Sequence, residues 1–266
     1  FYGDPYSNLL AGGVGNHTIH LWDIERLITG SGADTIRLHS FGASGLTTEM
    51  TIATRGGDDI VEGNGRRQTV YAGEGNDTVR GNGGLDLIHG GAGDDDLTAA
   101  LGDFVYGDSG NDLVRAGLGY GGTGTGRLDG GDGVDTLHLN GRAVIDLADN
   151  SIIGEGIRHE AFGFENVRID VSFDSMGGTA FGDGGANIMS GWSEYQSASA
   201  SVILDGRGGD DRLSGHNGSD QLAGGDGDDV LSGGGGADQL NGGAGNDTAD
   251  YSAAAWRVTA SLATGQ

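Results

Sequence analysis

The sequence has no cysteine, no lysine and a single proline. The lack of cysteine excludes a disulfide-stabilised scaffold. One proline excludes a collagen-like helix, which combines abundant proline with glycine at every third position. The 14 basic residues are all arginine and stand against 39 acidic residues, so the formal net charge is −25. Phosphate backbones repel such a chain, and no apolar run approaches the roughly 18 residues of a membrane helix, so we expect neither a nucleic-acid partner nor membrane insertion.

Glycine is abundant, with 58 of 266 residues, and it recurs with a period of nine. Five nonapeptides follow one another in a single register over 206–250, and a second run of five covers 54–98. Isolated copies occupy 107–115 and 130–138, and degraded copies lie at 3–11, 12–20, 29–37 and 182–190. A disordered chain would share the glycine content and the charge, but not this order.

Two positions of the nonapeptide are nearly constant in chemical type. The sixth is aspartate in twelve of the sixteen copies, and the eighth is a large aliphatic residue in nearly all of them. The candidate metal-binding residues are the aspartates at the sixth position: Asp34, Asp59, Asp77, Asp86, Asp95, Asp112, Asp135, Asp211, Asp220, Asp229, Asp238 and Asp247.

The repeat predicts very short strands joined by glycine turns. Alternation places the eighth residue on one face of a strand, and the glycine half turns the chain because glycine accepts positive φ. Two nonapeptides then make one flattened coil, with strands on opposite sides and the eighth side chains meeting between them. Coils stack at about 4.8 Å, the spacing of hydrogen-bonded strands. The predicted fold is all-β: parallel β-roll (β-solenoid) blocks joined by β-rich spacer segments.

This stacking brings like charges together. Asp211 and Asp229 come to lie on neighbouring coils, as do Asp220 and Asp238. Two carboxylates about 5 Å apart repel by roughly 3 kcal/mol at an effective dielectric of 20. One buried aliphatic side chain per repeat contributes about 2–3 kcal/mol, which does not offset the roughly 9–18 kcal/mol of backbone entropy of nine ordered residues. Without a cation, the fold should not form.

Calcium is the cation that the composition favours. Ca²⁺ takes six to eight carboxylate and carbonyl oxygens, whereas Mg²⁺ keeps its waters. The absence of cysteine and of paired histidines argues against zinc and copper. We predict about six to eight Ca²⁺ ions in rows along both edges, between turns two repeats apart. The alternative is a metal-free solenoid with plain Asp-Gly turns, which explains the glycines but not the fixed register of the aspartates.

Some copies depart from the pattern. Gln68 replaces the sixth-position aspartate, so we expect the site between its turn and the Asp86 turn to be weakened or absent. Asn8, His17 and Asn187 make their copies doubtful calcium sites, and we interpret the His17 copy as a capping coil.

The nonapeptide G-G-x-G-x-D-x-U-x, in which U is a large aliphatic residue, resembles the calcium-binding repeat of RTX (repeats-in-toxin) secreted proteins. The resemblance implies secretion by a type I route in an unfolded state, and an extracellular or cell-surface location. It also implies connector segments between blocks, to which IERL at 24–27 and FENV at 164–167 are similar.

On this basis we divide the chain into five segments. They are degenerate repeats and spacer over 1–53, a first β-roll block over 54–138, a β-rich spacer with one degenerate repeat over 139–205, a second block over 206–250, and the start of a further spacer over 251–266. The chain then resembles part of a longer modular protein.

No catalytic motif is complete, so we expect no enzyme activity. His159 and Glu160 begin an H-E-x-x-H pattern, but Gly163 stands where the second histidine is required. Two function classes remain: a calcium-binding structural segment of a large secreted bacterial surface protein (adhesin, surface layer, extracellular matrix or fibre), or the non-catalytic calcium module of a secreted enzyme (protease, lipase or alginate epimerase). Blocks separated by spacers favour the first. The apolar residues of 251–266 need a partner surface, which predicts self-association or contact with an adjoining module.

Overall fold

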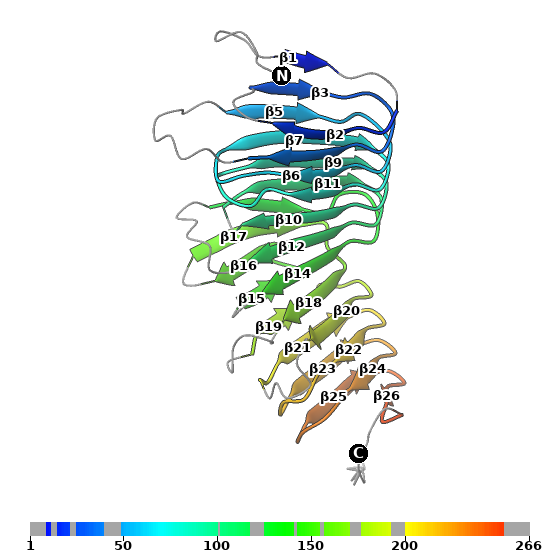
Figure 1. Ribbon diagram of the computed structural model, residues 1–266. Helices are drawn as coiled ribbons and strands as arrows, with labels where there is room; N and C mark the ends of the chain where they lie inside the picture. Colours follow the sequence, from blue (N-terminus) through cyan, green and yellow to red (C-terminus); the bar gives the residue numbers. More distant parts are fainter. Residues whose placement is uncertain are drawn as a thin grey trace, which may run out of the picture.

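The computed structural model describes residues 9–11, 15–21, 25–39, 49–100, 102–117, 125–140, 143–154, 157–170, 177–192 and 200–252. These residues form an elongated stack of coils (Figure 1). Two sequence predictions fall wholly or largely outside the described residues: the assignment of Asn8, and the further spacer predicted over 251–266, of which only 251 and 252 are described.

Within the described residues, the strands form two sheets that face each other along the stack. In spatial order, the 14-stranded sheet contains β1 (Leu9–Ala11), β3 (Arg26–Ile28), β5 (Met50–Ala53), β7 (Gln68–Glu74), β9 (Leu87–Ala92), β11 (Phe104–Ser109), β13 (Arg127–Asp129), β17 (Ile157–Phe162), β16 (Ser151–Gly154), β15 (Ala143–Asp146), β19 (Thr179–Phe181), β21 (Ile203–Gly208), β23 (Gln221–Asp226) and β25 (Gln239–Ala244). The 12-stranded sheet contains β2 (Thr18–Leu21), β4 (Thr35–Leu38), β6 (Ile60–Glu62), β8 (Thr78–Arg80), β10 (Asp96–Ala100), β12 (Leu113–Gly117), β14 (Thr136–Asn140), β18 (Asn166–Asp170), β20 (Ile188–Trp192), β22 (Arg212–Ser214), β24 (Val230–Ser232) and β26 (Thr248–Ala249).

The hydrophobic core lies between the two sheets and is built from the eighth positions of the repeats. Val70 pairs with Ile88 in parallel register on one sheet, and Val61 pairs with Val79 on the other. All four side chains are at most 2% exposed. Residues 18 apart are therefore neighbours on one sheet, and residues nine apart face each other across the core. The prediction of an all-β parallel solenoid is confirmed.

Close stacking of the turns explains the glycines at the second and fourth positions. Gly225 has φ +121°, and a Cβ on it would overlap the carbonyl of Arg207 on the preceding coil. Gly227 has φ +136°, and a Cβ there would overlap the carbonyl of Gly209. At these two residues a side chain would overlap the preceding coil. Elsewhere the second position does hold a side chain at positive φ, as in Arg55, Asn82, Asp108 and Arg207, so glycine is favoured there but not required.

The two sheets differ because of an antiparallel insertion. Strand β16 pairs antiparallel with both β15 and β17, so three strands of the larger sheet lie between β13 and β19. On the other sheet, β14, β18 and β20 follow one another directly. Two additional strands lengthen one side of the stack by about 10 Å at ordinary strand spacing. The solenoid must bend or twist at this wedge, and Figure 1 shows the coils from β19 onward tilted relative to the earlier ones.

Both sheets continue through the region that the sequence divides into blocks and spacer. Strand β14 of the first block pairs with β18, which pairs with β20, which pairs with β22 of the second block. The segment 139–205 is therefore part of the same stack. Its buried side chains, which include Ile145, Ile152 and Ile169, fill the wedge. The five-segment division itself stays a prediction.

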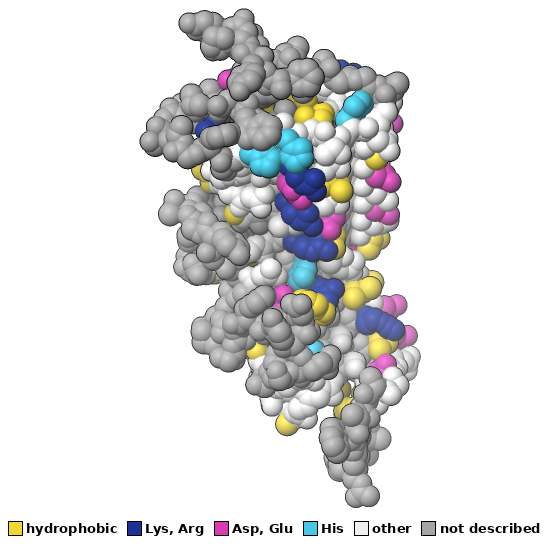
Figure 2. Space-filling view, viewed as in Figure 1, with side chains coloured by type: hydrophobic (Ala, Val, Ile, Leu, Met, Phe, Trp, Pro, Cys, Tyr) yellow, Lys and Arg dark blue, Asp and Glu magenta, His cyan; other side chains and the backbone are white. Residues whose placement is uncertain are grey.

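Several arginines lie in one line on the outer face of the 12-stranded sheet, away from the turns (Figure 2). Cross-strand register places Arg80, Arg115 and Arg168 in that line, with Thr98 and His138 between them. Acids on the same face neutralise part of the charge, since Arg115 pairs with Asp96. These cations therefore do not compensate the carboxylates at the turns.

Candidate calcium sites

One row of carboxylates runs along an edge of the solenoid. The backbone N–H of each sixth residue donates to Oδ1 of the sixth-position aspartate on the next coil, at 2.6 to 3.2 Å. The donor–acceptor pairs are Asp34 with Asp59, Asp59 with Asp77, Asp77 with Asp95, Asp95 with Asp112, Asp112 with Asp135, Asp211 with Asp229, and Asp229 with Asp247. The structure thus brings together the aspartates that the sequence pairs at a spacing of two repeats.

The second oxygen of most of these carboxylates is buried without a partner. This holds for Oδ2 of Asp34, Asp59, Asp77, Asp86, Asp95, Asp112, Asp135, Asp211 and Asp229. Each of these aspartates is at most 2% exposed. A buried carboxylate oxygen without a hydrogen bond costs several kcal/mol, so the row needs a counter-charge.

Backbone carbonyls lie beside these free oxygens. A Cβ on Gly107, the first residue of its repeat, would overlap both Oδ2 of Asp112 and the carbonyl oxygen of Gly130 on the next coil. Gly224 stands in the same relation to Asp229 and Gly242. Glycine at the first position therefore leaves space between a carboxylate and a carbonyl, which are both calcium ligands.

The donors available at these turns fit a hard cation. Among the described residues, no three side chains of His, Cys, Asp or Glu converge on one point. The expected site therefore combines two carboxylates with backbone carbonyls, and sequence analysis excludes the thiolates that zinc or copper would favour. Nδ1 of His20 lies 2.7 Å from Nε2 of His39, contrary to the expectation of no paired histidine. These two residues lie in β2 and just after β4, away from these turns.

Burial raises the pKa values of seven of these carboxyl groups, those of Asp59, Asp77, Asp86, Asp95, Asp112, Asp135 and Asp211. Desolvation is the largest cause in every case, and neighbouring carboxylates add to it. The pKa rises to about 7 for Asp77, Asp86 and Asp95, and to about 6 for Asp59, Asp135 and Asp211. Without a cation, the folded turns therefore hold protons near neutral pH.

The opposite edge carries a shorter row. Gln68 donates its backbone N–H to Oδ1 of Asp86, and Asp86 donates to Oδ1 of Asp103, at 2.7 and 2.9 Å. Asp220 donates to Asp238 at 3.0 Å. Asp103 was missed in the sequence because its coil is 17 residues long rather than 18. The sequence Asp103-Phe104-Val105 could have identified it, because it has the same order of acid, any residue and aliphatic residue as positions six to eight of the repeat.

The fifth position forms a parallel, exposed ladder that the sequence also did not reveal. Here the bonds run the other way along the stack: Asn76 N–H donates to Asp58 Oδ1, and Asp94 N–H donates to Asn76 Oδ1, both at 2.9 Å. Adjacent acids such as Asp94 and Asp95 therefore have different roles. The first is exposed and caps the turn, and the second is buried in the row.

Two degenerate turns are closed by their own amides. The Gln68 side-chain amide donates to the Arg66 carbonyl and to Asn64 Oδ1. The Asn187 amide donates to the Glu165 carbonyl and to Asp183 Oδ1, at 3.2 and 3.3 Å. An uncharged donor thus takes the place where the regular turns leave a free carboxylate oxygen. In the degenerate copy at 12–20, the His17 ring lies 2.8 Å from Asp34 Oδ1.

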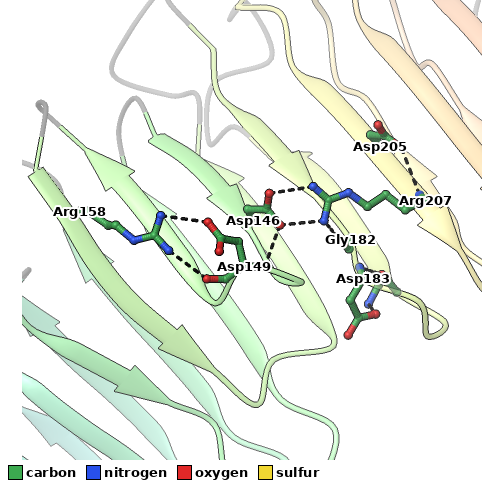
Figure 3. Close-up of polar contacts among 8 residues, drawn as sticks. Asp146, Asp149, Arg158, Gly182, Asp183, Asp205 and Arg207 are labelled. Atoms are coloured by element: carbon green, nitrogen blue, oxygen red, sulfur yellow. Dashed lines mark hydrogen bonds and ion pairs between the residues drawn. The ribbon is translucent and has the colours of Figure 1, made fainter.

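A guanidinium lies beside the Asn187 turn at the wedge (Figure 3). Arg207 donates to both oxygens of Asp146, at 2.8 and 2.7 Å, and to the Gly182 carbonyl at 2.9 Å. This contact lowers the pKa of Asp146. Close by, Arg158 pairs with Asp149 at 2.9 Å. Where the inserted strands interrupt the regular stacking of turns, ion pairs within the chain hold them together.

Comparison with protein families supports the interpretation of these turns as calcium-binding sites. The profile of the RTX calcium-binding nonapeptide repeat matches four stretches: 71–103, 102–119, 201–222 and 214–249. The chain therefore contains RTX calcium-binding nonapeptide repeats. Its RTX repeats mark it as a calcium-binding structural segment of a secreted protein. Comparison with curated proteins finds no match. Among the described residues of this RTX chain, there is no helix with the length and hydrophobicity that crossing a membrane requires.

Replacing one buried aspartate with asparagine tests whether the carboxylate row binds calcium. We expect Asp95→Asn to lower the number of bound calcium ions by at least one and to raise severalfold the calcium concentration at the folding midpoint, because the free Oδ2 becomes neutral. The matched control is Asp94→Asn, which removes the same charge one residue earlier, on the exposed ladder. Equilibrium dialysis gives the ion count and circular dichroism gives the midpoint. Equal effects of the two variants would contradict the assignment.

Protonation of the buried aspartates at low pH should partly replace bound calcium in stabilising the folded state. In the folded state, Asp59, Asp77, Asp86, Asp95, Asp135 and Asp211 have pKa values of about 6 to 7, against about 4 in the unfolded chain, so their protonation stabilises the folded state. That stabilisation is complete below about pH 4 and is lost as the pH rises through about 7. In chelator, we expect β-type circular dichroism to be strongest near pH 4 and to decrease toward pH 8, with centrifugation as a control for precipitation. A chelated spectrum that does not change between pH 4 and 8 would contradict this.

Proposed function

We propose that this chain is a calcium-folded structural segment of a large bacterial surface protein, such as an adhesin, a surface layer or an extracellular matrix or fibre protein. The observation that carries the proposal is the row of buried, unpartnered Oδ2 atoms repeated on successive coils. Bound calcium ions neutralise that row and join each coil to the next, so one ligand type stabilises the whole length. The aspartates at the sixth positions hold the ions, about six to eight in number.

The same chemistry makes calcium the signal for folding. Extracellular calcium modules bind at about 10⁻⁴ to 10⁻³ M, far above the calcium concentration of the cytosol. Below that range the stacked carboxylates repel one another, so the chain stays unfolded inside the cell, as a type I secretion route requires. Outside, millimolar calcium drives folding, because metal binding and folding are one equilibrium.

The shape of the molecule favours a structural role over the alternative of a calcium module in a secreted enzyme. The two sheets continue through the predicted spacer and form one elongated stack. Such a stack spans distance and transmits tension through main-chain hydrogen bonds. Each coil contacts only its neighbours, as in other repeat proteins, so length can be added without redesigning a core.

Calcium dependence of folding tests the proposal directly. We expect a coil-type circular dichroism spectrum in chelator at pH 7.5, and a β-type spectrum with a midpoint of about 10⁻⁴ to 10⁻³ M calcium. Magnesium at the same concentration is the control and should leave the chain unfolded. A β-type spectrum in chelator at this pH would overturn the proposed switch and favour the metal-free solenoid.

Self-association is a further part of the proposal. Among the described residues, β25 and β26 are the last strands of their sheets, and each pairs on one side. A strand with an open side can pair with another chain or with an adjoining module. We expect light scattering of the chain to increase when calcium is added. A monomer both with and without calcium would remove this part and would favour the enzyme-module alternative.

A further inference from the structure

The carboxylate row does not end with the last nonapeptide of the first block, the copy at 130–138. Asp135 is the sixth residue of that copy, and its backbone N–H donates to Oε2 of Glu165 at 2.7 Å. Glu165 thus accepts the bond that the next aspartate accepts elsewhere in the row. Asp135 is fully buried, and its Oδ2 has no hydrogen-bond partner. The free oxygen that marks the regular turns is therefore present here as well.

The backbone around Glu165 follows the pattern of the sixth position. In the repeats, the residue after the aspartate donates to the aspartate carbonyl of the preceding coil, as Thr136 N–H does to the Asp112 carbonyl at 2.8 Å. Asn166 N–H donates in the same way to the Asp135 carbonyl at 3.0 Å. Ile188 N–H in turn donates to the Glu165 carbonyl at 3.3 Å. Glu165 therefore occupies a sixth position, although no nonapeptide surrounds it.

The gap that a first-position glycine leaves between a carboxylate and a carbonyl is also present at this turn. A Cβ on Gly130 would overlap both Oδ2 of Asp135 and the carbonyl oxygen of Gly163. Gly107 has this relation to Asp112 and to the carbonyl of Gly130 one coil earlier. Gly163 takes φ +64°, which places its carbonyl in this position without a side-chain clash. Carboxylates and a carbonyl meet at this turn as they do in the regular repeats.

The charges near this turn favour a cation. Asp135 lies in the row between two other carboxylates: its Oδ1 accepts the N–H of Asp112 at 2.7 Å, and its own N–H donates to Glu165. Asp129 is neutralised by Arg127, whose Nη2 lies 2.6 Å from its Oδ2. No such contact neutralises Asp135 Oδ2.

We propose that a calcium ion binds between the turn that ends at Asp135 and the turn that contains Gly163 and Glu165, with Glu165 in the role of a repeat aspartate. The inference rests on the proposed function and extends it to residues outside the nonapeptides and outside the profile matches at 102–119 and 201–222. The ion would join the first block to strands β17 and β18, where the wedge begins. Beyond it, the Asn187 amide and Arg207 supply the next contacts.

The test is the calcium count of two matched variants. Glu165→Gln keeps the shape and can still accept the Asp135 N–H bond, so we expect it to fold at saturating calcium and to bind one ion fewer. Glu160→Gln is the control, because Glu160 lies on strand β17 with an exposed side chain and has the same charge. An unchanged count for Glu165→Gln would overturn the proposal.

A second variant keeps the test decisive if the glutamine variant does not fold. Glu165→Asp retains the carboxylate but shortens its reach, so a ligand at this position must shift the calcium titration while the ion count stays the same. A titration identical to that of the unmodified chain would overturn the proposal. If the unmodified chain itself binds no calcium, the proposed function fails, and that result is distinct from the loss of a single site.

Discussion

The structure depends on placing one buried carboxylate per coil in a continuous row. Strand pairing fixes the distance between neighbouring coils at about 4.8 Å, and the chain cannot relax this spacing without losing its hydrogen bonds. Each aspartate uses one oxygen to accept a backbone N–H from the preceding coil, and this bond holds the other oxygen in the interior. Repulsion along the row is thus built into the same contacts that define the solenoid. A divalent cation resolves it, and a proton does so in part.

Glycine makes this arrangement possible for two separate reasons. At the fourth position, a positive φ and close coil-to-coil contact both disfavour a side chain, as at Gly227. At the first position φ is ordinary, and the reason is space: a Cβ on Gly107 would fill the gap between a carboxylate and a carbonyl. The first-position glycine is therefore part of the candidate site, although it contributes no side chain to it.

The wedge shows how an aperiodic insertion is tolerated in a periodic stack. Two additional strands on one side lie between turns that would otherwise stack on each other. At this place Asn187 supplies an amide and Arg207 a guanidinium, and both bond to groups of the chain. These contacts are made within the chain, whereas regular turns such as those of Asp135 and Asp211 leave a buried carboxylate oxygen without a partner. The bend is therefore held by the protein itself.

The sequence alone determined the period, the fold class and the chemistry of the turns. A nine-residue repeat with an acid at the sixth position and an aliphatic residue at the eighth allows few other arrangements, because burial of residues such as Ile88 and repulsion between residues such as Asp77 and Asp95 both follow from the spacing. Only the tertiary structure decided which residues complete the rows where the period fails. Asp103 lies in a 17-residue coil, and Glu165 follows a three-strand insertion. Their positions depend on strand pairing between distant segments, which a local pattern does not specify. The physical reason is that hydrogen bonding between coils restores the register in space after it has been lost along the chain.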